Sequence, residues 1–187
     1  MIKILVQLAN GFEEMEALIP VDIWRRAGFV VETVSITGNK TVTGSHNIPV
    51  IADLLFEEAN FEDAQMIFLP GGMPGSSNLD AHDGLRKQLI SFSEKKKYLC
   101  AICAAPMVLG HNNILYGKRA TCFPGYEKEL TGANNTGANV EFDGNIITAK
   151  GAGVAMELAF CVTEMIMGED FTMKLAAKMQ VSPAVIP

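Results

Sequence analysis

The sequence contains no long hydrophobic run and no excess of basic residues. No apolar stretch approaches the roughly 20 residues that a membrane-spanning helix requires. Lys and Arg number 15 against 21 Asp and Glu, which gives a net charge of −6. A net acidic chain without a basic block is poorly suited to bind nucleic acid or an anionic membrane. We therefore expect no nucleic-acid partner and no membrane partner.

Cysteine and histidine are also scarce, with four and three residues. The apolar fraction of 49% in 187 residues is enough for one folded domain over residues 1–187. Thiols in such a chain are expected to be reduced, which favours a cytoplasmic location. No His or Cys cluster has zinc-ligand spacing, so no metal site is expected. The first eight residues hold one lysine and no small-residue cleavage site, which predicts a strand rather than a signal peptide.

Two periodicities alternate along the chain. Short apolar runs predict buried strands, and helical spacing of apolar residues predicts amphipathic helices between them. The predicted strands cover 2–9, 29–36, 64–69, 98–102, 120–122 and 146–148, with a short extended pair around 41–42 and 48–51. The main predicted helices cover 14–27, 83–95 and 153–167. This order predicts an α/β fold with a mainly parallel sheet between helix layers. Pro20 is expected in an early helical turn, residues 73–82 in a loop, and residues 168–187 in a mixed tail.

Unusual residues occur where three predicted strands end, at 10–16, 70–72 and 101–106. Binding sites of open parallel sheets lie beyond these carboxyl ends. Cys103 follows its strand directly and is followed by small residues, which is typical of a nucleophile elbow. The N–H groups and dipole of a helix start favour a thiolate there. Cys103 is therefore a candidate nucleophile with a lowered pKa.

Glu16 is the candidate partner of Cys103. A carboxyl among small and apolar residues at a neighbouring strand end is expected to stay protonated and to donate a hydrogen bond to the thiolate. Backbone N–H groups at the turn and at Gly71 and Gly72 are candidates for an oxyanion hole. The neighbouring acids, Glu13 and Glu14, are interpreted as favourable charges at a helix N-terminus.

Together these motifs resemble the ThiJ/PfpI superfamily, in the branch of bacterial YajL and human Parkinson disease protein 7. The resemblance runs from Ile2 to about Met167 and is carried by several ordered motifs. They are Gly11-Phe12-Glu13-Glu14-Met15-Glu16, Ile19-Pro20-Val21-Asp22, Arg25-Arg26-Ala27-Gly28, Leu69-Pro70-Gly71-Gly72, Ala101-Ile102-Cys103-Ala104-Ala105-Pro106, and Gly151-Ala152-Gly153 leading into Glu157. It implies a flavodoxin-like three-layer sandwich of the class I glutamine amidotransferase type, usually as a homodimer.

The resemblance also implies roles for individual residues. Cys103 would be the reactive thiolate and Glu16 its protonated partner, with an anion hole made by the N–H groups of Gly72 and Ala104. The expected substrate-binding residues are Gly71, His46, Arg26 and Phe123. Phe123 stands where the human-like branch often has a histidine, and His46 stands where that branch has an arginine near the anion site.

Two other cysteine chemistries are disfavoured. Ala104 occupies the position of one triad histidine, and the three histidines lie in polar or helix-end contexts expected to be solvated, which argues against a Cys-His-acid hydrolase. Cys100 and Cys103 match C-x-x-C spacing, but an odd separation in a strand points the side chains to opposite faces. Cys122 and Cys161 are interpreted as structural.

The preferred hypothesis is an enzyme that uses the Cys103 thiolate on small reactive carbonyls. The reaction would be of the glyoxalase or deglycase type, converting methylglyoxal to lactate or repairing glycated adducts without a cofactor. The alternative is a peroxide-responsive protein or redox chaperone, in which Cys103 is oxidised to a sulfinate. A small aldehyde or an oxidant is thus the expected partner.

Overall fold

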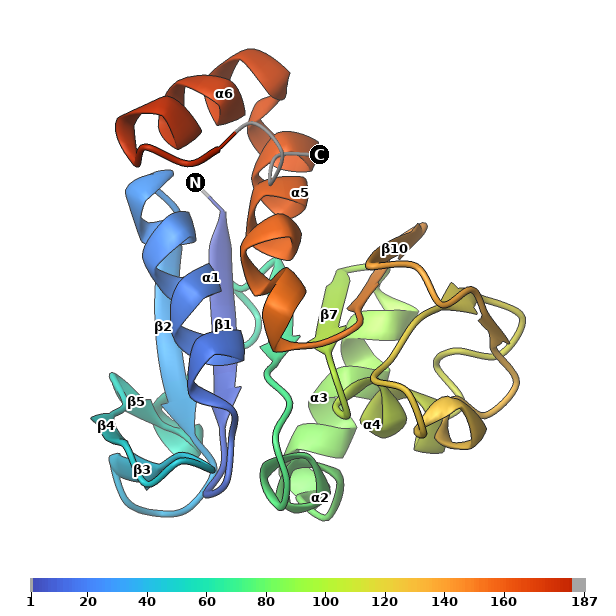
Figure 1. Cartoon of the computed structure of the whole chain (residues 1–187). Coiled ribbons are helices and arrows are strands. Elements are labelled where there is room, and N and C mark those ends of the chain that lie inside the picture. Colours follow the sequence, from blue (N-terminus) through green and yellow to red (C-terminus); the bar gives the residue numbers. More distant parts are fainter. Residues whose placement is uncertain (1, 183–187) are drawn as a thin grey trace.

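The computed structural model describes residues 2–182, and its centre is a seven-stranded sheet in the order β10-β11-β7-β6-β1-β2-β5 (Figure 1). β10 runs antiparallel to β11, and all other neighbours are parallel. The strands of this sheet are β1 (Lys3–Leu8), β2 (Val30–Ser35), β5 (Leu54–Leu55), β6 (Met66–Leu69), β7 (Tyr98–Ile102), β10 (Val140–Asp143) and β11 (Ile146–Ala149).

Helices cover both faces of the sheet and complete a three-layer sandwich. The α-helices are α1 (Glu14–Arg26), α2 (Gly75–Asp80), α3 (Asp83–Glu94), α4 (Pro106–His111), α5 (Ala155–Met167) and α6 (Glu169–Lys178). Short 3-10 turns are η1 (Phe56–Glu58), η2 (Glu127–Glu129) and η3 (Ala152–Val154). Two small sheets pair β3 (Thr41–Thr43) with β4 (Pro49–Ile51), and β8 (Arg119–Ala120) with β9 (Asn134–Asn135).

The sheet divides the core into two clusters. Along β1, Ile4, Val6 and Leu8 face the cluster made with α1, α5 and α6, whereas Leu5 faces the cluster made with α2, α3 and α4. A strand that is buried on both faces needs apolar residues at every position, which explains the continuous apolar run. The predicted α/β class and its mainly parallel sheet are therefore confirmed.

Three local expectations were wrong. Pro20 lies in the middle of α1, where the helix stays packed because buried Trp24 donates its indole N–H to the Ala159 carbonyl of α5 at 3.1 Å. The predicted loop over residues 73–82 contains α2, and the predicted mixed tail contains α6, which buries Leu175 and Ala176. Tertiary burial outweighed weak local signals in all three segments. Among residues 2–182, no helix is long and apolar enough to cross a membrane.

Candidate active site

Cys103 stands on a sharp turn directly after β7. Its φ of 64° lies in the left-handed region, which costs a non-glycine residue roughly 1–2 kcal/mol. Two hydrogen bonds hold this backbone in place: its N–H donates to the Ala149 carbonyl at 2.9 Å, and its carbonyl accepts from the Phe123 N–H at 2.8 Å. The thiol is half-buried. The predicted nucleophile-elbow geometry is therefore present.

Glu16 faces this turn from the first turn of α1. Glu13 caps the helix by accepting the Glu16 N–H at 2.6 Å, which fixes where the helix begins. The Glu16 side chain is 1% exposed, and its Oε2 has no hydrogen-bond partner among the described residues. A buried carboxyl oxygen without a donor is better accommodated when the group carries a proton.

Gly71 allows Glu16 and Cys103 to approach one another. A Cβ on Gly71 would contact Oε2 of Glu16 and would lie 2.6 Å from the Cys103 Cβ. Gly72 has a φ of 88°, and a Cβ there would lie 2.6 Å from the Gly11 carbonyl oxygen. Gly71 must be glycine because Glu16 and Cys103 approach it closely. Gly72 must be glycine because of its close contacts and its left-handed conformation.

Burial dominates the electrostatics of the pair. It raises the pKa of Glu16 to about 7, and the Glu13 carboxylate adds to the rise. Hydrogen bonds from the Cys103 thiol and from the backbone N–H groups of Gly71 and Ala152 lower the pKa of this carboxyl. At neutral pH a substantial fraction of the Glu16 carboxyls is therefore protonated, and no external acid is needed.

Cys103 does not have the lowered pKa that the sequence led us to expect. Burial, and next the negative charge of Glu16, raise the pKa of its thiol to about 12, although the N–H groups of Gly72 and Ala104 lower it. Two groups this close titrate as a pair and hold at most one negative charge near neutrality. The thiolate is available only when the proton resides on Glu16.

Two of the expected substrate-binding residues lie beside this pair. Phe123 is linked to Cys103 by the backbone hydrogen bond described above, and its ring packs against Gly151, where a Cβ would lie 3.2 Å from Phe123 Cδ2. Gly71 lies against both side chains of the pair.

His46 is held by an acid that the sequence analysis treated only as a favourable charge. Glu14 is 5% exposed, and its Oε2 lies 2.8 Å from His46 Nδ1. Its Oε1 accepts the His46 N–H at 2.8 Å. The His46 bond lowers the pKa of Glu14, although burial opposes it. The Glu14 side chain points to the turn before β4. The sequence gives no indication that Glu14 binds His46, apart from the position of Glu14 in α1.

Glu13, Glu14 and His46 bring together three groups of the kind that ligate metal ions. One ligand atom from each lies within 4.8 Å of the others. Carboxylate and imidazole donors suit a divalent transition metal. However, His46 Nδ1 and Glu14 Oε2 already form a hydrogen bond with one another, so the arrangement is a closed contact rather than an open coordination shell.

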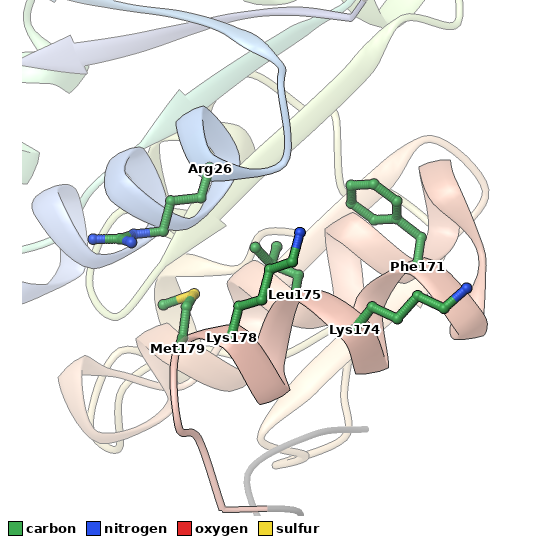
Figure 2. A pocket seen from close by; sticks show the side chains of 6 residues that line it. All are labelled: Arg26, Phe171, Lys174, Leu175, Lys178 and Met179. Atoms are coloured by element: carbon green, nitrogen blue, oxygen red, sulfur yellow. The ribbon is translucent and has the colours of Figure 1, made fainter.

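Arg26 is not brought to Cys103 within one chain. It ends α1, ten residues after Glu16 and therefore about 15 Å farther along the helix axis. It lines a separate hollow against α6, together with Phe171 and Lys178 (Figure 2). Its Nε donates to Asp22 Oδ2 at 2.7 Å.

The remaining histidines are structural contacts rather than simply solvated side chains. His82 caps α3 by accepting the Leu85 N–H at 2.9 Å. His111 bridges Asp80 and Glu129, at 2.9 Å from each ring nitrogen to a carboxylate oxygen. Neither contact reaches the thiol, so they provide no triad histidine.

Comparison with known proteins identifies the family of this chain. The family model described as DJ-1/PfpI matches residues 2–165. The chain is 34% identical over 179 residues to the Parkinson disease protein 7 homolog of Danio rerio, covering 94% of this chain and 95% of that protein.

Two solved structures are similar over nearly their whole length. A cysteine-to-alanine mutant of the DJ-1 superfamily protein STM1931 from Salmonella typhimurium has a TM-score of 0.92 at 32% identity, covering 97% of this chain and 100% of that one. Oxidized Toxoplasma gondii DJ-1 has a TM-score of 0.91 at 29% identity, with the same coverage.

Proposed function

Because the chain belongs to the DJ-1/PfpI family, we propose that it uses Cys103 and Glu16 to convert small reactive carbonyls, as a cofactor-independent glyoxalase or deglycase. The observation that supports this proposal is the close pair itself. A nucleophilic sulfur and a carboxyl with a pKa of about 7 face one another across Gly71. Such a carboxyl can both give and take a proton at physiological pH.

The proposed reaction begins with transfer of the thiol proton to Glu16. The thiolate adds to the aldehyde carbon of methylglyoxal and gives a hemithioacetal oxyanion, near the N–H groups of Gly72 and Ala104. Glu16 protonates this oxygen and becomes a carboxylate.

The Glu16 carboxylate then removes the proton from the former aldehyde carbon and returns it to the neighbouring carbon, while the proton of the hemithioacetal hydroxyl passes to the former ketone oxygen. The ketone is thereby reduced to a hydroxyl while the aldehyde carbon reaches the oxidation level of a thioester. Water hydrolyses the thioester, releases lactate and restores the thiol. The net reaction adds one water to methylglyoxal and needs no external oxidant or reductant.

The direct test is lactate production from methylglyoxal by the wild type, Cys103→Ser and Glu16→Gln. We expect turnover in the wild type, none in Cys103→Ser, and a loss of about 100-fold or more in Glu16→Gln, the usual size of a general acid–base contribution. Turnover that survives in Cys103→Ser contradicts the proposal.

The rate of Cys103 alkylation by iodoacetamide tests the shared proton separately. In the wild type the rate is expected to rise with a midpoint near pH 7, where the pair loses its first proton. In Glu16→Gln the midpoint should move to a more alkaline pH, because the thiol must then ionise alone in a buried site. A wild-type rate that only begins to rise above pH 9 would show that the sulfur keeps its proton.

A second candidate function is peroxide sensing. A solved relative, Toxoplasma gondii DJ-1, is described as oxidized, and the unpartnered Oε2 of Glu16 could donate a hydrogen bond to a sulfinate oxygen when protonated. Each peroxide molecule would transfer one oxygen to Cys103 and leave as water. Stoichiometric gain of two oxygens by mass spectrometry, with no lactate formed, would favour this function.

We also propose that the chain forms a homodimer in the cytoplasm. Large apolar side chains remain exposed on α1 (Met15 and Leu18) and around β4 (Ile48 and Ile51). The Glu14–His46 contact ties these two elements together. Such a patch on one side of a molecule favours burial against a second copy.

A further inference from the structure

A hollow of about 380 Å³ lies next to residues that contact Cys103 and Glu16. It is lined by Phe123, Pro124, Lys150 and residues 151–154. Two of these residues are linked to the reactive groups. The Phe123 N–H donates to the Cys103 carbonyl at 2.8 Å, and the Ala152 N–H faces the Glu16 carboxyl and lowers its pKa. The wall of the hollow therefore adjoins the Cys103 backbone and the Glu16 carboxyl, although neither of these residues lines the hollow itself.

The lining of the hollow is almost entirely apolar. The Phe123 side chain is 47% exposed although it packs on Gly151, so one face of its ring is available to a ligand. A proline and the small residues of 151–154 form the rest of the wall. The one charged side chain, Lys150, directs its ammonium to the Gly137 carbonyl at 3.4 Å. Apolar surface of this kind gains free energy when an apolar substituent covers it.

We propose that this hollow is a subsite for the apolar substituent of the carbonyl substrate, and that Phe123 determines its specificity. The substrate class is α-oxoaldehydes that carry an aromatic or branched alkyl group in place of the methyl group of methylglyoxal. The inference rests on the proposed carbonyl chemistry and names its preferred substrates. The reacting atoms and proton transfers are unchanged, because only the group attached to the ketone carbon differs.

The test compares kcat/KM for phenylglyoxal and methylglyoxal, each divided by its rate constant with a free small thiol to remove intrinsic reactivity. The wild type is expected to favour phenylglyoxal by about 10-fold or more, the size of discrimination that an apolar pocket provides. Phe123→Ala should reduce this preference several-fold, because kcat/KM is expected to fall more for phenylglyoxal than for methylglyoxal. Phe123→Leu, which keeps an apolar side chain, should retain most of it.

Phe171→Ala is the matched control, because it removes an aromatic ring from the separate hollow beside α6 (Figure 2). It should leave the preference unchanged. Absence of turnover with both substrates would overturn the proposed function itself. Turnover of methylglyoxal without a preference for phenylglyoxal would overturn only the subsite. A preference that persists in Phe123→Ala would overturn the role of Phe123.

Discussion

At the scale of single residues, α1 carries two buried carboxyls with opposite electrostatics. Glu14 and Glu16 are both almost fully buried in the first turn. Glu14 accepts hydrogen bonds from a backbone N–H and from an imidazole, whereas Oε2 of Glu16 has no donor. Burial raises the pKa of Glu16, and the His46 contacts lower that of Glu14 despite burial. Hydrogen-bond donors, and not depth alone, decide which carboxyl keeps its proton.

This contrast predicts opposite pH dependences of stability for two matched variants. The pKa of Glu16 rises from 4.5 to about 7 on folding, so its contribution is full below pH 4.5 and is lost as the pH rises through 7. Relative to the wild type, Glu16→Gln should therefore gain about 3 kcal/mol of unfolding free energy between pH 4.5 and pH 8.

Glu14→Gln should behave in the reverse manner, because a lowered pKa contributes stability above its ordinary value of 4.5 that is lost on acidification. It should be less stable than the wild type at pH 7 and approach it at low pH. Urea unfolding at several pH values measures both variants. Parallel curves for Glu16→Gln and wild type would contradict the assignment of the raised pKa to Glu16.

A second residue-scale prediction concerns the glycine between the reactive groups. Gly71→Ala would place a methyl group against Oε2 of Glu16 and 2.8 Å from the Ile102 carbonyl oxygen, so the pair must move apart. We expect Cys103 alkylation at pH 7 to slow by about 10-fold or more, since a small misplacement in an active site can cost up to about 100-fold.

Gly153→Ala is the control for this change, because no heavy atom lies within 4 Å of a Cβ there. It should leave the alkylation rate unchanged, and circular dichroism should show both variants folded. An unaltered rate in Gly71→Ala would show that the approach of Glu16 to Cys103 is not needed for reactivity.

At the scale of elements, the sequence predicts the strands and helices whose apolar pattern and end signals lie within the element itself. β7 and the turn at Cys103 follow from an apolar run that ends at small residues, and the structure has β7 at Tyr98–Ile102 as expected. Helix α1 continues through Pro20, because its packing against α5 compensates for the lost hydrogen bond. The Glu14–His46 contact joins residues 32 positions apart, and no local pattern encodes such a contact. Contacts between residues far apart in the chain could therefore not be predicted from the sequence alone.

His111 is the clearest example of such a pair at the level of elements. It ends α4, which follows Cys103, and its ring nitrogens contact Asp80 at the end of α2 and Glu129 in η2. Hydrogen bonds to Asp80 and then Glu129 raise its pKa above 6.5. The contact therefore stabilises the fold fully below pH 6.5 and loses this contribution as the pH rises through the raised pKa.

His111→Gln should accordingly reduce the free energy of unfolding at pH 6 and have a smaller effect at pH 9. The loss should be about 1 kcal/mol or less, because the side chains are partly exposed and solvent screens them. Urea unfolding of the double variant Asp80→Asn/Glu129→Gln should show the same weakened pH dependence. An equal loss at both pH values in His111→Gln would indicate that packing, and not charge, explains the effect.

At the scale of the whole molecule, the start of α1 carries both Glu16 and part of the apolar patch, Met15 and Leu18. Met15 lies between Glu14 and Glu16 in the chain and is half exposed, so a second copy seated on this patch would cover the helix turn that holds Glu16. Glu16 is already buried within one chain, so a second copy would preserve its raised pKa by holding this turn in place rather than by burying the carboxyl. Dimerisation and reactivity are therefore expected to be coupled.

Ile51→Lys tests this coupling at a distance from the reactive groups, because Ile51 ends β4 and is 79% exposed. A buried lysine without a partner is costly at an interface, so the variant should dissociate. Light scattering should give twice the 20.2 kDa chain mass for the wild type and a single chain mass for Ile51→Lys. Ile90→Lys, at an exposed position of α3 on the other helix layer, should remain dimeric. In the dissociated variant the partner no longer holds the turn that buries Glu16, so the alkylation midpoint of Cys103 should move below pH 7. A monomeric wild type would contradict the proposed assembly.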